Sequence, residues 1–167
     1  YIEECFNLSL KIIKKNKIHA LINGPVSKKH FLKKKFPGVT EYIAKKTNSK
    51  QPVMLIYNKD LAVSPLTTHV PIKKVASFIK KKKIINNIIK INSFYKSRLQ
   101  KIPNIAVLGL NPHCETNHKI SEEKREIIPA INFLKKKNFL VTGPIPADTF
   151  FLQKNIKKYD VVIGMYH

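Results

Sequence analysis

A chain of 167 residues is long enough to bury one hydrophobic core, and its 43% hydrophobic and 25% charged residues are typical of a globular domain. No run of about 18 apolar residues is present, which excludes a helical membrane span, so we expect no membrane partner. The net charge of +22 does not indicate a nucleic-acid partner, because only Arg98 and Arg125 of the 32 basic residues are arginines and the lysines are spread over most predicted helices.

The first third of the chain predicts a helix, a strand and a second helix. Apolar residues from Ile2 to Ile13 recur at helical spacing, residues 18–22 form a short apolar run, and a basic helix is expected from about Ser27. Two further apolar runs, 53–57 and 61–66, are joined by only three polar residues. That link is short for a parallel crossover, so these runs predict a hairpin.

Strands and helices alternate along the rest of the chain. Helices are expected after Pro71, over about 84–99 and from Ser121, with a kink or late start at Pro129. The clearest buried strand is 105–110, and the others expected are 139–142 and 161–165. This alternation predicts an α/β fold with a largely parallel sheet, in a single domain over residues 1–167.

The two ends of the chain indicate a fragment, and the cysteines indicate the compartment. The chain opens at Tyr1 inside a helical pattern and stops at His167 directly after a strand pattern, so we expect an internal fragment of a longer protein, truncated at both ends. Cys5 and Cys114 are expected to be free thiols in a reducing compartment, which favours the cytoplasm.

Three histidines each follow an apolar run: His69, His113 and His167. Ligands of open α/β sheets bind beyond the carboxyl ends of the strands, where three imidazoles could converge on one divalent cation. Each histidine taken alone is better explained as an ordinary loop or core residue. Their repeated placement favours a metal site.

Short loops rich in Gly, Pro and Asn also follow the strands. They include 23–28, which ends in Lys28, and 143–148, which ends in Asp148. Glycine lets the backbone turn close to a ligand and proline stiffens it, so such loops suit a rigid site. Ordinary turns, an exposed Lys28 and a helix-capping Asp148 are the alternative interpretations.

Five segments in order resemble the signature blocks of the 4-hydroxythreonine-4-phosphate dehydrogenase family of pyridoxal phosphate biosynthesis. They are Asn-Gly-Pro-Val-Ser-Lys at 23–28, Thr-Thr-His-Val-Pro at 67–71, Gly-Leu-Asn-Pro-His at 109–113, Gly-Pro-Ile-Pro-Ala-Asp-Thr at 143–149 and Met-Tyr-His at 165–167. The resemblance covers nearly the whole chain. It implies a three-layer α/β/α fold with a mixed, largely parallel sheet, like that of isocitrate and isopropylmalate dehydrogenases.

The resemblance also assigns roles to individual residues. It implies that His69, His113 and His167 bind the metal and that Asp148 lies beside it. Lys28 is implied as an active-site lysine and Thr40 as a substrate-binding residue. The family's site lies at a homodimer interface and takes one metal histidine from the partner subunit, so a single chain is expected to be inactive.

The implied reaction is the NAD-linked oxidation of 4-(phosphooxy)-L-threonine to a 3-keto acid, which decarboxylates to 3-amino-2-oxopropyl phosphate. The implied cofactors are NAD(P) and a divalent cation, Zn, Mg or Co, which would polarise the reacting oxygen. No Gly-x-Gly-x-x-Gly motif is present, so the nicotinamide cofactor is implied by the resemblance only.

Two departures from the family keep alternatives open. Val39 stands where the family usually has histidine, and the loop at 114–118 is shorter and lacks the family's glycines. A related dehydrogenase of a four-carbon sugar-acid phosphate would use the same histidines. An inactive basic α/β remnant that binds polyanions is the alternative from another class.

Overall fold

The computed structural model describes residues 1–15, 18, 20–27, 29–32, 35–114, 120–152 and 156–167. By its internal contacts the chain divides into two compact units, 1–52 and 53–167. The predicted Lys28 lies outside the described residues. No helix within the described ranges is long and apolar enough to cross a membrane.

The first unit contains two helices, α1 (Ile2–Lys14) and α2 (Val39–Lys46), around a small aromatic core. The helix expected at the start of the chain is confirmed. The described residues of 18–22 form no strand, because an apolar run needs a partner strand and the described part of this unit has none. The basic helix expected from about Ser27 is also wrong for the described residues, which form turns there.

The second unit is built on a four-stranded sheet. Its strands are β1 (Ala62–Pro65), β2 (Ile105–Leu108), β3 (Val141–Ile145) and β4 (Val161–Gly164). They lie in the order β1-β4-β2-β3, and every pairing is parallel. The α/β prediction is therefore confirmed. The expected hairpin is reduced to one antiparallel bridge between Ile56 and Val63, outside the parallel ladder.

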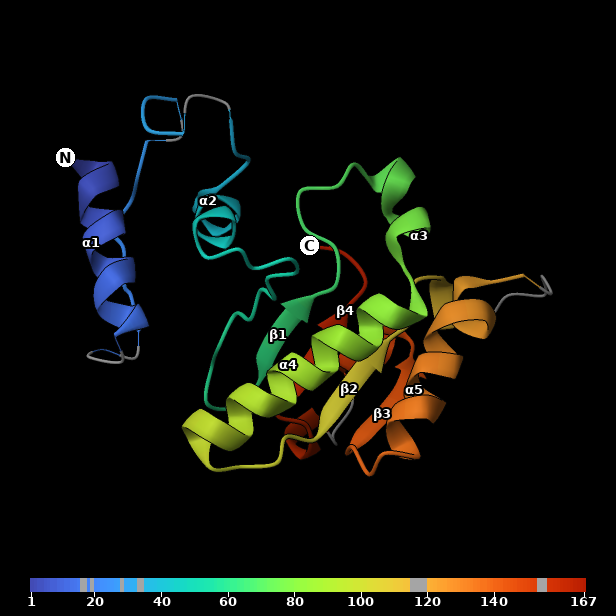
Figure 1. Cartoon of the computed structure of the whole chain (residues 1–167). Coiled ribbons are helices and arrows are strands. Elements are labelled where there is room, and N and C mark those ends of the chain that lie inside the picture. Colours follow the sequence, from blue (N-terminus) through green and yellow to red (C-terminus); the bar gives the residue numbers. More distant parts are fainter. Residues whose placement is uncertain (16–17, 19, 28, 33–34, 115–119, 153–155) are drawn as a thin grey trace. The chain divides into compact units, whose positions relative to one another are not determined.

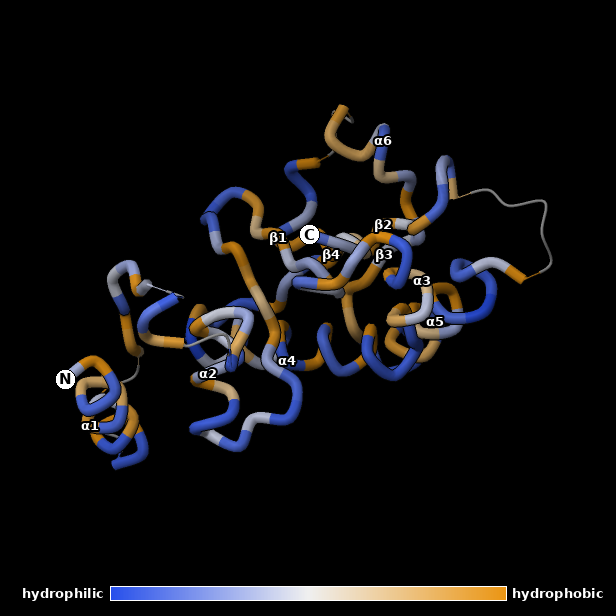
Figure 2. Tube along the Cα trace, turned by 90° about the horizontal axis from the view of Figure 1, so that it is seen from above, coloured by the Kyte–Doolittle hydropathy of each residue, from blue (hydrophilic) through white to orange (hydrophobic). Residues whose placement is uncertain are grey.

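Helices cover both faces of this sheet (Figures 1 and 2). One face carries α3 (Val75–Phe78), α4 (Lys81–Leu99) and α5 (Ile128–Lys135), and the other carries α6 (Ala147–Phe150). On α4 the buried isoleucines 84, 88 and 91 recur at helical spacing and pack against strand residues. Phe150 of α6 is fully buried against Ala106 and Val162 on the opposite face.

Pro129 shapes the entry into α5, as the sequence predicted. Ser121 Oγ accepts a hydrogen bond from the Lys124 N–H (3.2 Å), and a π-helical segment, Glu123–Ile127, follows before α5 begins. Because Pro129 has no N–H for the Arg125 carbonyl, the regular α-helical ladder is interrupted there. The π turn directs Glu123 into the interior, where it is 1% exposed.

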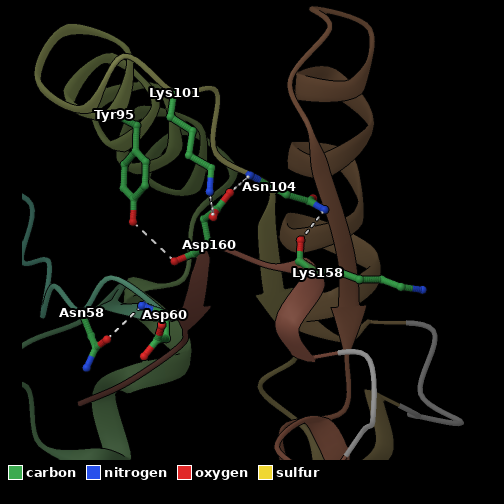
Figure 3. A network of polar contacts seen from close by, with 7 residues as sticks. All are labelled: Asn58, Asp60, Tyr95, Lys101, Asn104, Lys158 and Asp160. Carbon is green, nitrogen blue, oxygen red and sulfur yellow. Dashed lines mark hydrogen bonds and ion pairs between the residues drawn. The ribbon is translucent and has the colours of Figure 1, made fainter.

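Asp160 braces the amino-terminal edge of the sheet (Figure 3). Its carboxylate accepts hydrogen bonds from the Asn104 backbone N–H (2.9 Å) and from Lys101 Nζ, and its carbonyl oxygen accepts one from Tyr95 Oη (3.4 Å). Burial, with Asp160 and Tyr57 nearby, raises the pKa of Tyr95 to about 12, so its phenol stays protonated as a donor. The starts of β2 and β4 are therefore joined at the edge opposite the histidines.

Replacing Asp160 by alanine is expected to lower the free energy of unfolding by about 2 kcal/mol, because the half-buried Asn104 N–H loses its charged acceptor. The bond from Tyr95 Oη is kept in this variant, since it ends on the Asp160 backbone carbonyl. The matched variant is Lys101→Ala, which removes only a partner whose side chain is 58% exposed and should cost less than about 1 kcal/mol. Urea unfolding of both variants measures the difference. If both variants lose the same free energy of unfolding, the stabilisation comes from the exposed ion pair with Lys101 and not from the hydrogen bond with the Asn104 N–H.

Candidate active site at the carboxyl edge of the sheet

Four of the predicted site residues follow the carboxyl ends of the four strands. His69 follows β1, His167 follows β4, His113 follows β2 and Asp148 follows β3. Because all pairings are parallel, these four chain segments leave the sheet at one edge. This is the edge at which open α/β sheets bind their ligands.

The ends of β1 and β4 bring His69 and His167 together. Beyond the last paired residues of these strands, Leu66 N–H donates to the Gly164 carbonyl (2.7 Å), and the buried Thr67 Oγ1 donates to the Met165 carbonyl (2.8 Å). The two imidazole rings then lie with their centroids 6.5 Å apart and their planes 21° from parallel. His69 has a positive φ of 53°, a left-handed backbone conformation that is uncommon for non-glycine residues.

His113 makes a second pair, with Asp148. It lies in the short 3₁₀ turn Pro112–Cys114, where His113 and Cys114 both have positive φ values, 55° and 56°. His113 Nδ1 lies 3.0 Å from Asp148 Oδ2, and both side chains are open to solvent. A carboxylate on Nδ1 fixes the imidazole orientation and leaves Nε2 available to a ligand.

A β-bulge at the end of β3 sets the position of Asp148. Ala106 pairs with Thr142 and Leu108 with Ile145, so two residues of β3, Gly143 and Pro144, lie opposite the single residue Val107. A bulge of this kind bends the strand and redirects the chain that follows. The bent chain enters α6, whose buried Phe150 anchors the helix on the sheet.

Glu123 is a functional candidate that sequence reasoning missed. Its Oε1 accepts hydrogen bonds from the backbone N–H groups of Leu110 and Asn111, both 2.8 Å, and its Oε2 accepts one from Asn111 Nδ2 (2.8 Å). Burial alone would raise the pKa of this carboxyl, but the hydrogen bonds from Asn111 and Leu110 outweigh it, and the pKa is lowered. Glu123 is therefore a buried, ionised group that holds the loop before His113.

One signal in the sequence could have revealed it. Glu123 falls on the same helical stripe as the apolar residues at 127, 130, 131 and 134, all of which are buried. A carboxylate on an apolar stripe needs a specific set of donors, since burying an unpaired charge is costly.

The remaining predicted positions belong to the first unit or lie outside the description. Thr40 lies exposed in the first turn of α2, and the unusual Val39 is the first residue of that helix. Lys28 and residues 115–118 of the divergent loop lie outside the described residues.

The donor set suits a borderline divalent cation, since imidazoles and a carboxylate are the ligands that zinc and cobalt accept. Within the described part of the second unit these groups form two pairs, His69 with His167 and His113 with Asp148. The described residues contain no group of three or more His, Cys, Asp or Glu side chains placed to hold a metal ion together.

Comparisons with known proteins assign the chain to a family. The sequence profile described as "Pyridoxal phosphate biosynthetic protein PdxA" matches residues 1–167. The 4-hydroxythreonine-4-phosphate dehydrogenase of Sulfurihydrogenibium sp. is 37% identical over 163 residues, covering 95% of this chain and 50% of that protein. The D-threonate 4-phosphate dehydrogenase of Pectobacterium atrosepticum is 32% identical over 166 residues, covering 98% of this chain and 51% of that protein.

The fold agrees with solved structures. The crystal structure of 4-hydroxythreonine-4-phosphate dehydrogenase from Klebsiella pneumoniae superposes with a TM-score of 0.85 at 30% identity, covering 98% of this chain and 51% of that chain. The chain thus spans about half the length of the relatives that it matches. Since the family profile matches the chain from its first residue to its last, the chain belongs to the family of pyridoxal phosphate biosynthetic protein PdxA.

Proposed function

We propose that this chain is an internal part of a metal-dependent, NAD-linked dehydrogenase that oxidises 4-(phosphooxy)-L-threonine in pyridoxine 5'-phosphate biosynthesis. The observation that carries the proposal is that the chain segments bearing His69, His167, His113 and Asp148 all leave the parallel sheet at its carboxyl edge. Relatives that bear this dehydrogenase's name support the substrate class.

The proposed reaction moves a hydride and a proton. The substrate's hydroxyl carbon gives a hydride to NAD, the hydroxyl proton leaves to a base, and the resulting 3-keto acid loses carbon dioxide to give 3-amino-2-oxopropyl phosphate. We assign the proton-accepting role to Lys28 and substrate contact to Thr40, following their places in the family's motifs.

His69, His113 and His167 would hold the divalent cation through neutral imidazole nitrogens. A bound cation would polarise the reacting oxygen and lower the pKa of the substrate hydroxyl. The Asp148 carboxylate lies 3.0 Å from His113 Nδ1, where it would accept a hydrogen bond from the Nδ1–H and so favour the tautomer in which Nε2 carries the lone pair. The pair thereby keeps one imidazole ready for a ligand before any cation arrives.

We also propose a homodimer with a shared site. In one chain the imidazoles are divided between the His69–His167 pair and the His113–Asp148 pair. A second subunit that supplies one histidine would complete a set of three. Both cysteines are free thiols, which is consistent with our proposal of a cytoplasmic location.

A second candidate is the dehydrogenase of a four-carbon sugar-acid phosphate. It is favoured by the D-threonate 4-phosphate dehydrogenase relative, which this chain matches over as much of its length. Threonate carries a hydroxyl where phosphohydroxythreonine carries the amine, so the two substrates present the same hydroxyl and phosphate to the histidine edge. Residue 39, a valine here, is a position at which the two activities could be separated.

Formation of NADH by the full-length protein tests the two candidates side by side. With a divalent cation present, we expect kcat/KM for 4-(phosphooxy)-L-threonine to exceed that for D-threonate 4-phosphate by at least about tenfold, because a site that pairs with the amine rejects a hydroxyl analogue. The reverse ratio would assign the sugar-acid activity. If neither substrate gives NADH, both dehydrogenase proposals are wrong and the non-catalytic alternative is favoured.

A further inference from the structure

We propose that Glu123 is a positioning residue that sets the place of the His113 imidazole through the loop Gly109–Asn111. This inference rests on the proposed function, because it concerns how a metal-binding histidine is held. The proposed role needs no contact of Glu123 with substrate or cofactor. It acts through the backbone that leads to His113.

The carboxylate is saturated by donors from one short segment. Two backbone N–H groups, those of Leu110 and Asn111, donate to the same oxygen, and the Asn111 amide donates to the other. The side chain is 1% exposed, so water does not compete for these bonds. Charge-assisted hydrogen bonds in such surroundings are stronger than neutral ones, and losing the acceptor would leave buried N–H groups without partners.

The packing around the loop leaves little room for another arrangement. A Cβ at Gly109 would lie 2.5 Å from Cys114 Sγ and 3.2 Å from Glu123 Oε1, so the loop backbone lies directly against both groups. The Cys114 N–H donates to the Asn111 carbonyl (3.1 Å), which closes the turn that contains His113. Glu123 thus anchors the residues from which this turn starts.

The anchor is itself rigid. Glu123 opens the π-helical segment that leads into α5, and the next buried residue on its stripe, Ile127, is fully enclosed in the main core. The imidazole at the other end of the loop meets Asp148 on α6. His113 is therefore held from two elements on opposite faces of the sheet, through its backbone by Glu123 and through its ring by Asp148.

The test compares Glu123→Gln with Glu122→Gln in the full-length protein. Both variants remove one negative charge at adjacent positions. Glu122 is half-buried and makes only a 3.1 Å contact with the same Asn111 amide. Three readouts are needed: amide hydrogen exchange at Leu110 and Asn111, the Kd for Zn²⁺ in the metal-free protein, and kcat with KM for NADH formation.

For Glu123→Gln we expect exchange at both amides to accelerate by about tenfold, because their shared acceptor loses its charge. The Kd for Zn²⁺ should rise about 10- to 100-fold, as for other residues that orient metal ligands, and kcat should fall more than KM changes. Glu123→Ala should have larger effects in the same direction. Glu122→Gln should stay within about twofold of wild type in every readout.

Equal exchange rates and equal Zn²⁺ affinities in Glu123→Gln and Glu122→Gln would overturn the inference. A different failure belongs to the proposed function: wild-type protein that neither binds Zn²⁺ nor reduces NAD. In that case faster exchange in Glu123→Gln would still establish the anchor of the loop, while its role in metal binding and catalysis would be refuted.

Discussion

Replacing His113 by alanine in the full-length protein is expected to lower kcat/KM for NADH formation by about 10³-fold or more. A cation that polarises the reacting oxygen contributes several kcal/mol to transition-state stabilisation, and each 1.36 kcal/mol corresponds to about tenfold in rate. His113 is the histidine that the structure prepares most fully, with a fixed turn on one side and Asp148 on its ring. The His113→Ala substitution should therefore remove a metal ligand and not only a packing contact.

His30→Ala is the matched control, because His30 is an exposed histidine of the first unit that carries no proposed role. It should leave kcat/KM within about twofold of wild type. Asp148→Asn should give an intermediate loss of about 10- to 100-fold, since it disturbs only the orientation of His113. Wild-type turnover in His113→Ala, in the presence of a strong chelator, would refute the metal-based mechanism.

Replacing Gly143 by alanine is expected to lower the free energy of unfolding by at least about 3 kcal/mol, the largest loss of stability that we foresee for a single methyl group. Gly143 has a φ of +148°, which L-residues seldom adopt, and a Cβ there would lie 2.4 Å from the Val107 carbonyl oxygen. That oxygen belongs to the central strand β2 and cannot withdraw without disturbing the sheet. The bulge that leads to Asp148 would have to open.

Gly164→Ala is the control for this prediction. Gly164 ends β4 at the same edge, but a Cβ there would meet only the Tyr166 carbonyl oxygen at an ordinary 3.6 Å. We expect a change within about 1 kcal/mol in urea unfolding. If the two alanine variants have the same free energy of unfolding, the bulge tolerates a side chain at position 143 and the prediction is wrong. If only Gly143→Ala loses free energy of unfolding, the close approach of β2 and β3 at the bulge is confirmed.

Much of the second unit could be predicted because its signals are local. The apolar run at 105–110 and the helical spacing over 84–99 each specify an element, and alternation of such elements predicts a parallel sheet. The strand expected at 139–142 begins at Val141 and runs on to Ile145, because the glycine and proline that look like a turn form the bulge inside β3. In the first unit, the described residues of the apolar run 18–22 have no partner strand among the described residues, and no local pattern can reveal that.

The site was predictable only in its outline. Strand ends locate His69, His113, His167 and Asp148 at one edge, since parallel strands share their carboxyl ends. Which histidine meets which depends on the order β1-β4-β2-β3, and that order is set by long-range packing. Glu123 was missed because the groups that make its burial possible, the N–H groups of Leu110 and Asn111, are brought to it by the tertiary fold, although its place on the apolar stripe was visible in the sequence.

A crystal structure of the full-length protein with Zn²⁺, with the ion located by anomalous scattering, tests the account most directly. We predict one peak beyond the carboxyl ends of β1, β4 and β2, bonded at about 2.1 Å to the free imidazole nitrogens of His69, His113 and His167, with one of the three donated by a second subunit. An ion bound elsewhere, with these rings turned to separate regions and no cavity between them, would contradict it.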